Sequence, residues 1–538
     1  MNVNIDDILL ANKDNWSNVL ETFVNNALTT FSFPELTDET KRRNVWDAIY
    51  NIANCSEDPN VIKNCFIAVR ILSRETNQLY ELINYKWMDL IKKHSGLNNE
   101  KFEFSKDKTL ICIEVMKSLS NILFNSRQLA SKTVENGILE GLTNRIKQFK
   151  NKNIPDEVKF MDAKLLFLIT ALSHEARKYL NMIEPLLVIL EDVLHNAAKN
   201  HVENEDLPTI LLTDAQADLV SEILKALFNL TIRIEESHVK NLTIYIRLVK
   251  VLRSYLLISS VNSEKTWTLR NNVVNLLTNM PEETYTELFP ASEGYPGLKS
   301  LEFEGMNMTA IYEILMFLKA KFNCETSISN QHEIFSPVVT VLLKGATSHR
   351  AVRKFLKNQI LPPLKDVHSR PEQGSTLRNH LCRLLTTPTT ELRDLVAELL
   401  FVLCKKSVAR MIKYTGYGNA AGLFAKKGLL AGGEDKGQGD YSDSEDSETE
   451  EYADHKHGIN PVIGCYEEPH PSVLDTMSEE QREYEAMKLV ELIDSLMKCG
   501  VIKPCVVGED GKPKQVTHVL ELQDQLKNKQ ITFAEDSD

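Results

Sequence analysis

The sequence predicts an all-α protein: an armadillo/HEAT-like helical-repeat solenoid followed by a disordered acidic linker and a C-terminal helix. Three observations support this fold class. Apolar residues recur at i, i+3, i+4 and i+7 through most of residues 1–428, which is the period of an amphipathic helix. The same region has no alternating strand of useful length. Its helical segments also resemble one another at intervals of 50–58 residues, which is typical of stacked helical repeats.

Helix-period segments follow one another along these residues. No such segment can bury its apolar face alone, so stacking of neighbours must form a continuous core. The segments are FIAVRILSR (66–74), CIEVMKSLSNILF (112–124), KLLFLITALSHEARKYL (164–180), LVSEILKALFNLTIRI (219–234), RNNVVNLLTNMP (270–281), LRNHLCRLLTT (377–387) and LVAELLFVLCKK (395–406).

One position recurs in the repeats. Aligning them places Arg70, Asn121, Ala171, Asn229 and Asn279 at the same point of successive helices. An asparagine among leucines needs partners, because an unpaired buried amide costs about 1–3 kcal/mol. Either each amide bonds a neighbouring helix, or the amides line a groove on the concave face and bind the backbone of a peptide. The recurrence favours the groove, and the first alternative remains open for Asn229 and Asn279.

The pattern changes after residue 428. We predict a superhelix over 1–428, a phosphorylatable disordered linker over 429–470, an amphipathic helix over 471–500 and a weakly ordered tail over 501–538. The linker is rich in Gly and acidic residues, a composition typical of disorder. Ser478 and Gln481 form a capping-box pattern, and Gly500 ends the helix. The apolar stripe of this helix must pack on the solenoid or on a partner.

Charge and composition exclude several classes of protein. The net charge is −13, and residues 434–454 alone hold ten acidic residues and one lysine. The rest of the chain is nearly neutral, which argues against nucleic-acid binding. No apolar run predicts a membrane span, and the N-terminus has no signal-peptide pattern. The nine cysteines are scattered without a C-x-x-C pair, which favours reduced thiols in the cytoplasm.

Motifs of covalent catalysis are missing from the sequence. There is no phosphate-binding loop, nucleophile elbow, zinc-protease motif or kinase signature. We therefore expect no catalytic residues, no cofactor and no enzymatic activity. His455 and His457 could hold a metal ion in principle, but two histidines in an acidic linker are more often solvated, and we predict no metal site.

Two groups of basic residues are candidates for binding acidic partners. Arg70 and Arg74 lie four residues apart, on one helical face, which suits a carboxylate in the groove, although surface arginines with buried stems would look the same. Arg350, Arg353 and Lys354 form a second cluster, fit for phosphate or carboxylates. A solvated helix face is the alternative for this cluster.

The acidic linker carries two candidate phosphorylation sites. Ser442 has Glu445 at +3 and Ser447 has Glu450 at +3, the spacing that casein-kinase-type enzymes recognise. Each phosphate would add about −1.5 to −2 charges and could dock on an arginine cluster. We hypothesise that the phosphorylated linker binds the cluster around Arg350.

The stretches LLFLITALS, ALFNLT and NLLTNMP, and above all VVTVLLKGATSHRAVRKFLKNQILPPLKDV with the chain from LRNHLCRLLTTP to GLLAGG, resemble the synembryn family (resistance to inhibitors of cholinesterase). The resemblance covers most of residues 60–500 and is weak in the first fifty and last forty residues. Members are armadillo/HEAT-repeat proteins of the cytoplasm, with recruitment to the cell cortex.

The resemblance implies a receptor-independent guanine nucleotide exchange factor and folding chaperone for α subunits of heterotrimeric G proteins (Gα). It implies that GDP-bound or nascent Gα is bound, that GDP is released and that the nucleotide-free form is held until GTP enters. By position, Arg70, Arg74 and Asn121 match family groove residues, and the cluster at Arg350 matches the family's basic cluster. Ser442 and Ser447 match its phosphorylated linker, although some members have Thr at the second site.

A passive armadillo adaptor for linear peptides is the alternative function. Adaptors of the importin type carry regular Trp/Asn ladders, but Trp16, Trp46, Trp87 and Trp267 do not follow the asparagine position. We expect Gα subunits and a casein-kinase-type kinase as partners, and a monomer. The class of Gα is not set by the sequence.

Overall fold

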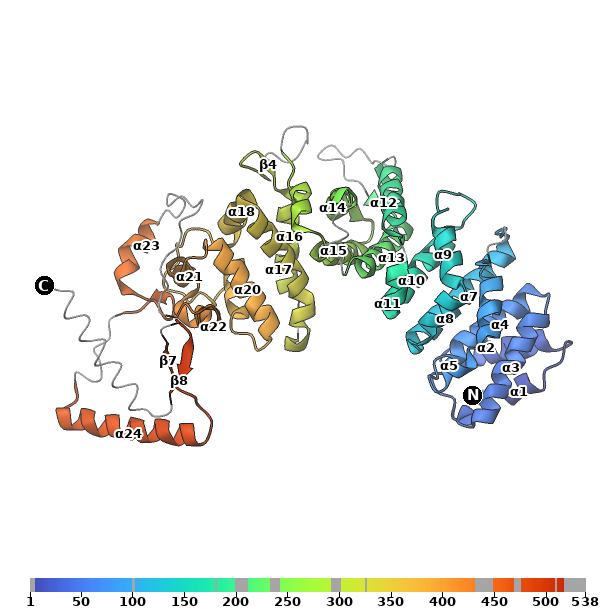
Figure 1. The fold of residues 1–538 in the computed structure, drawn as a ribbon, viewed down its shortest axis with the longest axis horizontal. Coiled ribbons are helices and arrows are strands. Elements are labelled where there is room, and N and C mark those ends of the chain that lie inside the picture. The colour runs from blue at the N-terminus through green and yellow to red at the C-terminus, as the bar shows by residue number, and fades with distance from the viewer. Residues whose placement is uncertain are drawn as a thin grey trace. The chain divides into compact units, whose positions relative to one another are not determined.

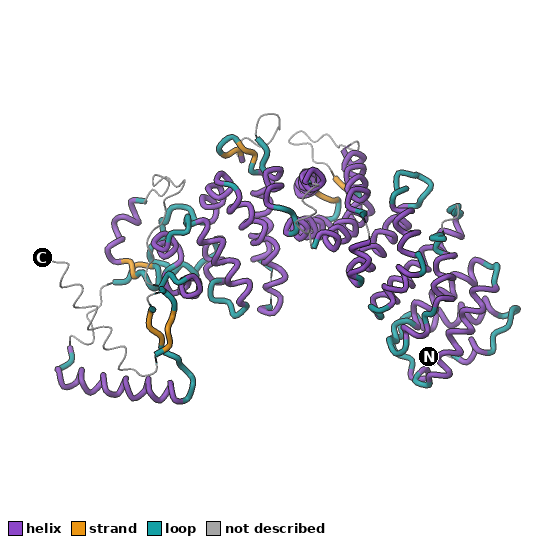
Figure 2. The backbone as a smooth tube through the Cα atoms, in the orientation of Figure 1, coloured by secondary structure: helices purple, strands orange, loops and turns teal. Residues whose placement is uncertain are grey.

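The computed structural model describes residues 5–98, 102–179, 181–198, 211–232, 242–291, 301–324, 327–430, 449–468, 476–508 and 510–516. The chain divides into two compact units, Met1–Leu288 and Phe289–Asp538. Helices predominate in both units (Figure 1), and the strands occur only as short pairs in the described residues (Figure 2). The all-α prediction is confirmed.

The described residues of the first unit form a succession of helices and one short parallel strand pair, β1 (Leu211–Leu212) with β2 (Ser259–Ser260). Its helices are α1 (Asp6–Leu9), α2 (Trp16–Ala27), η1 (Pro34–Leu36), α3 (Glu39–Cys55), α4 (Pro59–Leu72), α5 (Leu79–Leu82), α6 (Tyr85–His94), α7 (Lys106–Asn125), α8 (Leu129–Glu135), α9 (Ile138–Ile146), α10 (Asp156–Leu172), α11 (His174–Tyr179), α12 (Ile183–Ala198), α13 (Asp214–Thr231), α14 (Leu242–Leu257), α15 (Ser263–Thr278) and η3 (Glu282–Leu288).

The recurring helices of the sequence stack on one another in this unit. α4 packs on α7, α7 on α10, α10 on α13, and α13 on α15. Each of these helices contributes buried apolar residues, such as Phe66, Leu119, Leu166 and Leu227. The predicted helical-repeat architecture is therefore confirmed, with the core running through the stack as repeats require.

Side-chain caps begin four of the five stacked helices, and at α15 the cap is Asn262, which accepts from the backbone of Glu264. Asp58 accepts from the backbone of Asn60 at the start of α4, and Ser105 accepts from Lys108 at the start of α7. Thr213 and Gln216 form a full capping box before α13. Such caps satisfy backbone N–H groups that have no partner inside the helix, so the sequence itself fixes where these helices begin.

The second unit contains further helices and three antiparallel strand pairs among its described residues. They are β3 (Glu302–Phe303) with β4 (Met306–Asn307), α16 (Thr309–Phe322), η5 (Ile328–Asn330), α17 (Gln331–Ser348), α18 (Arg350–Ile360), α19 (Leu377–Leu384), α20 (Thr390–Leu403), α21 (Val408–Thr415), α22 (Tyr417–Lys427), α23 (Glu450–His455), η7 (Lys456–Gly458), β5 (Ile459–Asn460) with β6 (Cys465–Tyr466), α24 (Glu479–Lys498), and β7 (Cys505–Val507) with β8 (Pro513–Gln515). Helix α17 packs on α16, α18 and α20.

Part of the predicted linker, residues 449–468, is ordered and packed on this unit. Thr449 donates to the carbonyl of Leu364 and caps α23, whose Tyr452 is buried. The β5–β6 turn contacts the start of α22, where the backbone N–H of Tyr417 donates a hydrogen bond to the carbonyl of Pro461 at 2.8 Å. There Gly464 leaves room for the backbone of Gly416, since a Cβ on Gly464 would lie 2.9 Å from the Gly416 Cα. Specific backbone pairing outweighs the disorder that the acidic composition favours.

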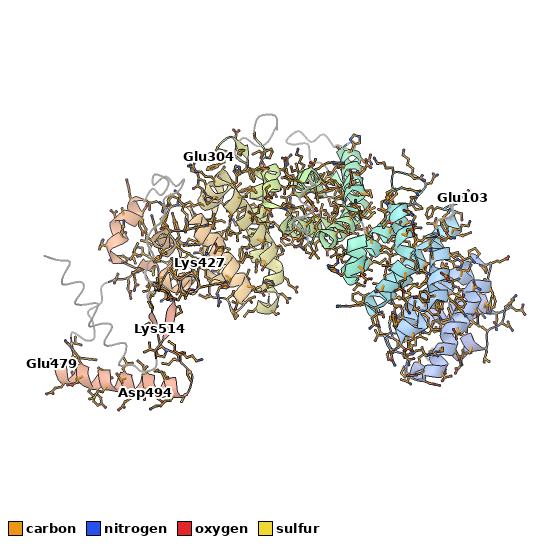
Figure 3. The ribbon with its side chains drawn as sticks, viewed as in Figure 1. Glu103, Glu304, Lys427, Glu479, Asp494 and Lys514 are labelled. Atoms are coloured by element: carbon orange, nitrogen blue, oxygen red, sulfur yellow. The ribbon has the colours of Figure 1, made fainter. Side chains whose placement is uncertain are left out.

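Helix α24 forms as its local signals predict but buries none of its residues. The capping box of Ser478 and Gln481 is present, and Gly500 follows with a φ of 69°. Figure 3 labels Glu479 and Asp494 on this helix, whose side chains project all around it. None of the described helices combines the length and apolarity needed to cross a bilayer.

Candidate functional site

A cavity of about 310 Å³ opens between α4, α7 and α10 in the first unit. Four cationic side chains line it, together with an amide, a serine hydroxyl, an exposed aromatic ring and apolar residues. The polar members and the ring are Arg70, Arg74, Lys117, Lys164, Ser120, Asn121 and Phe124. No acidic side chain is among the lining residues, so the cavity suits an anionic group.

Helical spacing explains why these side chains converge. Lys117 and Asn121 are four residues apart on α7 and therefore share one face. Lys164 lies on α10 and Arg70 on the last turn of α4. Because α4, α7 and α10 stack in order, residues on equivalent faces of three repeats meet at one cavity.

One carboxylate is paired with two of the cations. Glu114 Oε2 lies 3.3 Å from a guanidinium nitrogen of Arg70, and Glu114 Oε1 lies 2.8 Å from Lys117 Nζ. The Glu114 side chain is only 15% exposed and is not among the lining residues. Two cations on one carboxylate leave an excess of positive charge for a ligand.

Arg74 lines the cavity but uses its donors on its own chain. One guanidinium nitrogen donates to the carbonyls of Leu28 at 3.0 Å and Thr30 at 2.6 Å. The guanidinium carbon also lies 4.8 Å from the centre of the Phe31 ring. Burial, and then the charge of Arg70, lower the pKa of Arg74, but an arginine remains charged at neutral pH.

The three recurring asparagines make the same contact in successive repeats. Each Nδ2 donates to a carbonyl of the preceding stacked helix and to a hydroxyl three residues further along that helix. The pairs are Asn121 with Arg70 O (3.0 Å) and Ser73 Oγ (2.8 Å), Asn229 with Phe167 O (3.2 Å) and Thr170 Oγ1 (3.2 Å), and Asn279 with Phe228 O (3.0 Å) and Thr231 Oγ1 (3.1 Å).

These bonds describe the alternative that the sequence left open, in which each amide bonds a neighbouring helix. Asn121 also lines the cavity, whereas Asn229 and Asn279 do not. At the equivalent position α10 has Ala171, whose side chain cannot make this bond. Arg177 of α11 donates to the carbonyls of Thr170 (2.5 Å) and Ala171 (3.0 Å) at the end of α10 itself. A role of the asparagine amides toward a partner remains a prediction.

Sequence reasoning found Arg70, Arg74 and Asn121 but missed Lys117, Lys164 and Phe124. A signal for the two lysines was available, because Lys117 lies four residues before Asn121 and Lys164 seven residues before Ala171, so each shares the face of the recurring position. Phe124 had the same signal, because it lies three residues after Asn121, but only the structure shows that it is 75% exposed.

The basic cluster of the second unit lies on α18. Lys354 Nζ pairs with Glu304 at 2.7 Å, a residue labelled in Figure 3, and Arg353 donates to the carbonyl of Ala346 at 3.2 Å. Arg350 occupies the first position of the same helix. Ser442 and Ser447 lie outside the described residues, so the docking hypothesis stays a prediction.

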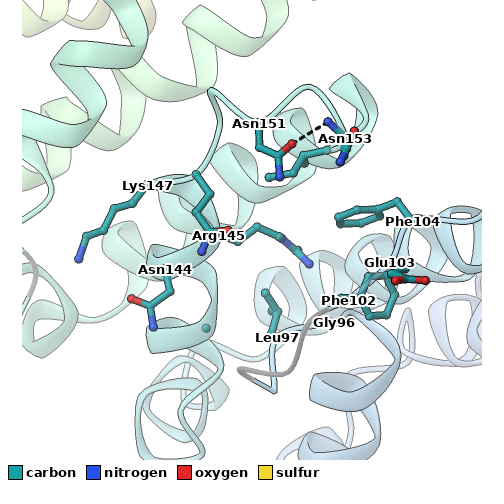
Figure 4. Close-up of a pocket in the computed structure, with 13 residues that line it drawn as sticks. Gly96, Leu97, Phe102, Glu103, Phe104, Asn144, Arg145, Lys147, Asn151 and Asn153 are labelled. Atoms are coloured by element: carbon teal, nitrogen blue, oxygen red, sulfur yellow. Dashed lines mark hydrogen bonds between the residues drawn. The ribbon is translucent and has the colours of Figure 1, made fainter.

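A second cavity of about 1100 Å³ lies between the loop before α7 and the end of α9 (Figure 4). At its wall, Arg145 Nε donates to Asp162 Oδ2 at 2.8 Å, and an outer nitrogen donates to Asp162 Oδ1 at 2.5 Å. Asp162 is fully buried. In a bidentate pair of this kind the guanidinium and the carboxylate bind each other. Arg145 on α9 therefore holds Asp162 on α10 and stabilises the packing of these two helices.

Metal-ion binding finds no support in the part of the chain that the structure describes, where no group of three or more His, Cys, Asp and Glu side chains is suitably placed. His455 packs instead against the rings of His368 and Tyr466, with ring centres 5.0 and 5.3 Å away.

Comparisons with known proteins give consistent matches. A family model described as guanine nucleotide exchange factor synembryn matches residues 65–512. The chain is 36% identical to Chaperone Ric-8A of Gallus gallus over 92% of each chain. It is 35% identical to Chaperone Ric-8 of Drosophila melanogaster, over 90% of this chain and 91% of that protein. Identity to Chaperone Ric-8A of Danio rerio is 35% over 97% of both chains.

Proposed function

The chain belongs to the synembryn family of guanine nucleotide exchange factors, and on that premise we propose that it is an exchange factor and folding chaperone for Gα subunits. It binds GDP-bound or nascent Gα, promotes the release of GDP and holds the nucleotide-free form until GTP binds. The observation that carries this proposal, beyond family membership, is the cationic cavity formed by α4, α7 and α10.

Exchange of this kind needs no catalytic side chain. A protein accelerates GDP release when it binds nucleotide-free Gα more tightly than GDP-bound Gα, since a ligand with equal affinity for both states shifts nothing. The same preference for an open conformer serves a chaperone. In this proposal the cavity takes the acidic C-terminal end of Gα, and Arg70, Lys117 and Lys164 supply the charge that holds it.

The test is the release of a fluorescent GDP analogue from purified Gα subunits of several classes, with and without the full chain. We expect the full chain to accelerate release. We expect Arg70→Glu to weaken Gα binding by at least about tenfold, because it replaces a cation of the cavity with a carboxylate, which also repels Glu114. Arg43→Glu is the matched control, since Arg43 is 62% exposed and does not line the cavity.

The outcomes separate the candidate functions. Release that Arg43→Glu keeps and Arg70→Glu loses supports exchange driven from the cavity. Tight binding of Gα without faster release supports a chaperone or a peptide adaptor and removes the exchange activity from the proposal. Absence of binding to every Gα class overturns the proposal.

We also propose that a casein-kinase-type kinase phosphorylates Ser442 and Ser447, and that the phosphates dock on Arg350, Arg353 and Lys354. Support comes from the position of the three basic residues on α18 and from the affinity of arginine for phosphate. Phosphorylation should raise the melting temperature of the full chain, and Arg353→Glu should remove the gain. An equal gain in the variant would show that the phosphates bind elsewhere.

A further inference from the structure

We propose that the loop between α2 and α3 is a specificity element of the cavity, in which Phe31 contacts an apolar side chain of the bound Gα segment and Arg74 positions the loop. This inference rests on the proposed function. It assigns a contact to residue 31, which lies before the residues that the family model matches.

Arg74 fastens this loop to α4. Its guanidinium donates to two loop carbonyls, those of Leu28 and Thr30. The same guanidinium packs against the ring of Phe31, 4.8 Å from its centre, which adds a cation–π attraction of about 0.5–1 kcal/mol at an exposed site. Three contacts from one side chain therefore define where residues 28–31 lie.

The ring of Phe31 is exposed and touches a side chain that lines the cavity, although Phe31 is not itself a lining residue. Phe31 is 74% exposed, although the loop residue Phe33 is 3% exposed and belongs to the core. Since Arg74 lines the cavity, the ring of Phe31 lies beside the cavity. Phe124, 75% exposed, lines the cavity itself. Single exposed apolar residues are ordinary, but two large rings beside a group of cations form a mixed surface.

The chemistry of this surface identifies its ligand. The cations Arg70, Lys117 and Lys164 attract a carboxylate. A large apolar side chain that covers the exposed rings would bury apolar surface of both partners, which favours binding. The matching segment has an acidic group next to bulky apolar residues. Large aromatic side chains are enriched at interfaces and anchor them where binding removes them from water, so a covered Phe31 should discriminate between segments that differ in the size of the apolar residue.

Arg74 acts in this scheme as a positioning residue. Its donors satisfy loop carbonyls, so its removal would release Phe31 and would leave Arg70, Lys117 and Lys164 to attract the ligand. The loss of a direct ion pair would weaken the salt dependence of binding, whereas the loss of a positioned ring would lower affinity without changing the salt dependence.

The experiment is a titration of the full chain with a fluorescent peptide that carries the C-terminal residues of a Gα subunit, at low and at physiological salt. Phe31→Ala should weaken binding roughly fivefold to thirtyfold, as the truncation of an interface anchor does, and Phe31→Leu should recover part of the loss. Leu10→Ala is the control, because Leu10 is 80% exposed and does not line the cavity. Thermal unfolding of each variant checks the fold.

Arg74→Ala should weaken binding to a similar extent. The salt dependence of binding should fall less in Arg74→Ala than in Arg70→Ala, because Arg74 adds charge at the cavity but makes no ion pair with the ligand. The Phe31→Ala/Arg74→Ala double variant should be no weaker than the worse single variant, because coupled residues are not additive. Additive losses, with a salt dependence that falls as far as in Arg70→Ala, would make Arg74 a direct contact and overturn its positioning role.

Two results overturn the assignment of Phe31, and they are distinguishable. If Phe31→Ala binds like the wild type while Arg70→Glu loses the peptide, the loop is not a contact and the proposed function stands. If the wild type binds neither the peptide nor any full-length Gα, the proposed function fails, and the role of the loop fails with it.

Discussion

Helices α7 and α24 are both twenty residues long and both begin at a serine cap, yet α7 is packed inside the protein and α24 is exposed. Ten residues of α7 are buried, and none of α24 is. The local signals for the two helices are equally clear, with Ser105 bonding the backbone of Lys108 and Ser478 that of Gln481.

The difference lies in what surrounds each helix. α7 packs between α4 and α10. Burial of its apolar face therefore stabilises the fold by about 25 cal/mol for each Å² of apolar surface removed from water. α24 keeps Tyr484, Met487, Leu489 and Leu492 more than half exposed. A helix can therefore be fixed by its caps and periodicity while its contribution to stability depends on its neighbours. Substitutions in the packed stack should therefore cost more stability than substitutions on α24.

Asp162→Asn should destabilise the stack behind α7 by about 3–5 kcal/mol, because it leaves the buried charge of Arg145 without its carboxylate. All four tryptophans lie in the first unit, so urea unfolding followed by tryptophan fluorescence reports on this region. The Arg145→Met/Asp162→Leu double variant should recover much of the loss. A loss below 1 kcal/mol in the single variant would contradict the assigned role of the pair.

Leu119→Ala on α7 should cost about 2–5 kcal/mol, since Leu119 is fully buried and its truncation leaves a cavity. Leu492→Ala on α24 should change stability by no more than about 0.5 kcal/mol, because Leu492 is 55% exposed and exposed substitutions are usually neutral. Hydrogen exchange measured by mass spectrometry follows both helices in one sample. Equal effects at the two sites would remove the contrast between α7 and α24.

The interior of the stack should also respond to acid through His94. Burial, and then Lys93, lower the pKa of His94 to about 4, and its Nε2 has no hydrogen-bond partner. The unfolded chain therefore binds the proton first, below about pH 6.5, and stability falls as the pH drops toward 4. From pH 7.5 to 5.0 this histidine should cost on the order of 2 kcal/mol.

His94→Gln, which cannot be protonated in this range, should lose correspondingly less stability over the same pH interval. Urea unfolding of both proteins at each pH, followed by tryptophan fluorescence, measures the difference. The same pH dependence in variant and wild type would show that His94 is protonated with its ordinary pKa in the folded protein.

Asn229→Ala should cost about 1–2 kcal/mol, because it removes hydrogen bonds to the carbonyl of Phe167 and the hydroxyl of Thr170 and leaves the carbonyl buried without that donor. Asn323→Ala is the control, because Asn323 is an exposed C-cap residue of α16 and its loss should change stability little. If Asn229→Ala kept full stability but lost Gα binding, the asparagine would serve the partner and not the stack.

Ser478→Ala should have the smallest effect, about 1 kcal/mol of helix stability lost at the N-terminus of α24. Because α24 buries no residue, this loss should stay local. Faster hydrogen exchange of residues 479–482 with an unchanged melting temperature of the first unit would be the expected result. A cooperative loss of stability in the whole chain would mean that α24 is coupled to the rest of the protein.

The helices, their caps and their repetition follow from local features of the sequence. Apolar spacing of 3.6 residues sets helical faces before any packing is known, and the serine and threonine caps of α7, α13 and α24 depend only on the few residues that follow them. The family could also be recognised from the chain, because long stretches such as 340–433 carry its pattern.

The roles of the polar residues, in contrast, depend on contacts that form when the chain folds. The sequence placed Asn121, Asn229 and Asn279 at one recurring position but could not say that each amide donates to the helix before it, since the partner carbonyl is about fifty to sixty residues away in the chain. Arg74 was predicted as a groove cation, yet it donates to a loop 44 residues earlier. Residues 449–468 were expected to be disordered on composition, and backbone pairing with Val367 and Tyr417 orders them. A hydrogen bond depends on distance and direction between groups that the chain brings together from far apart, and that information arises only when the repeats stack.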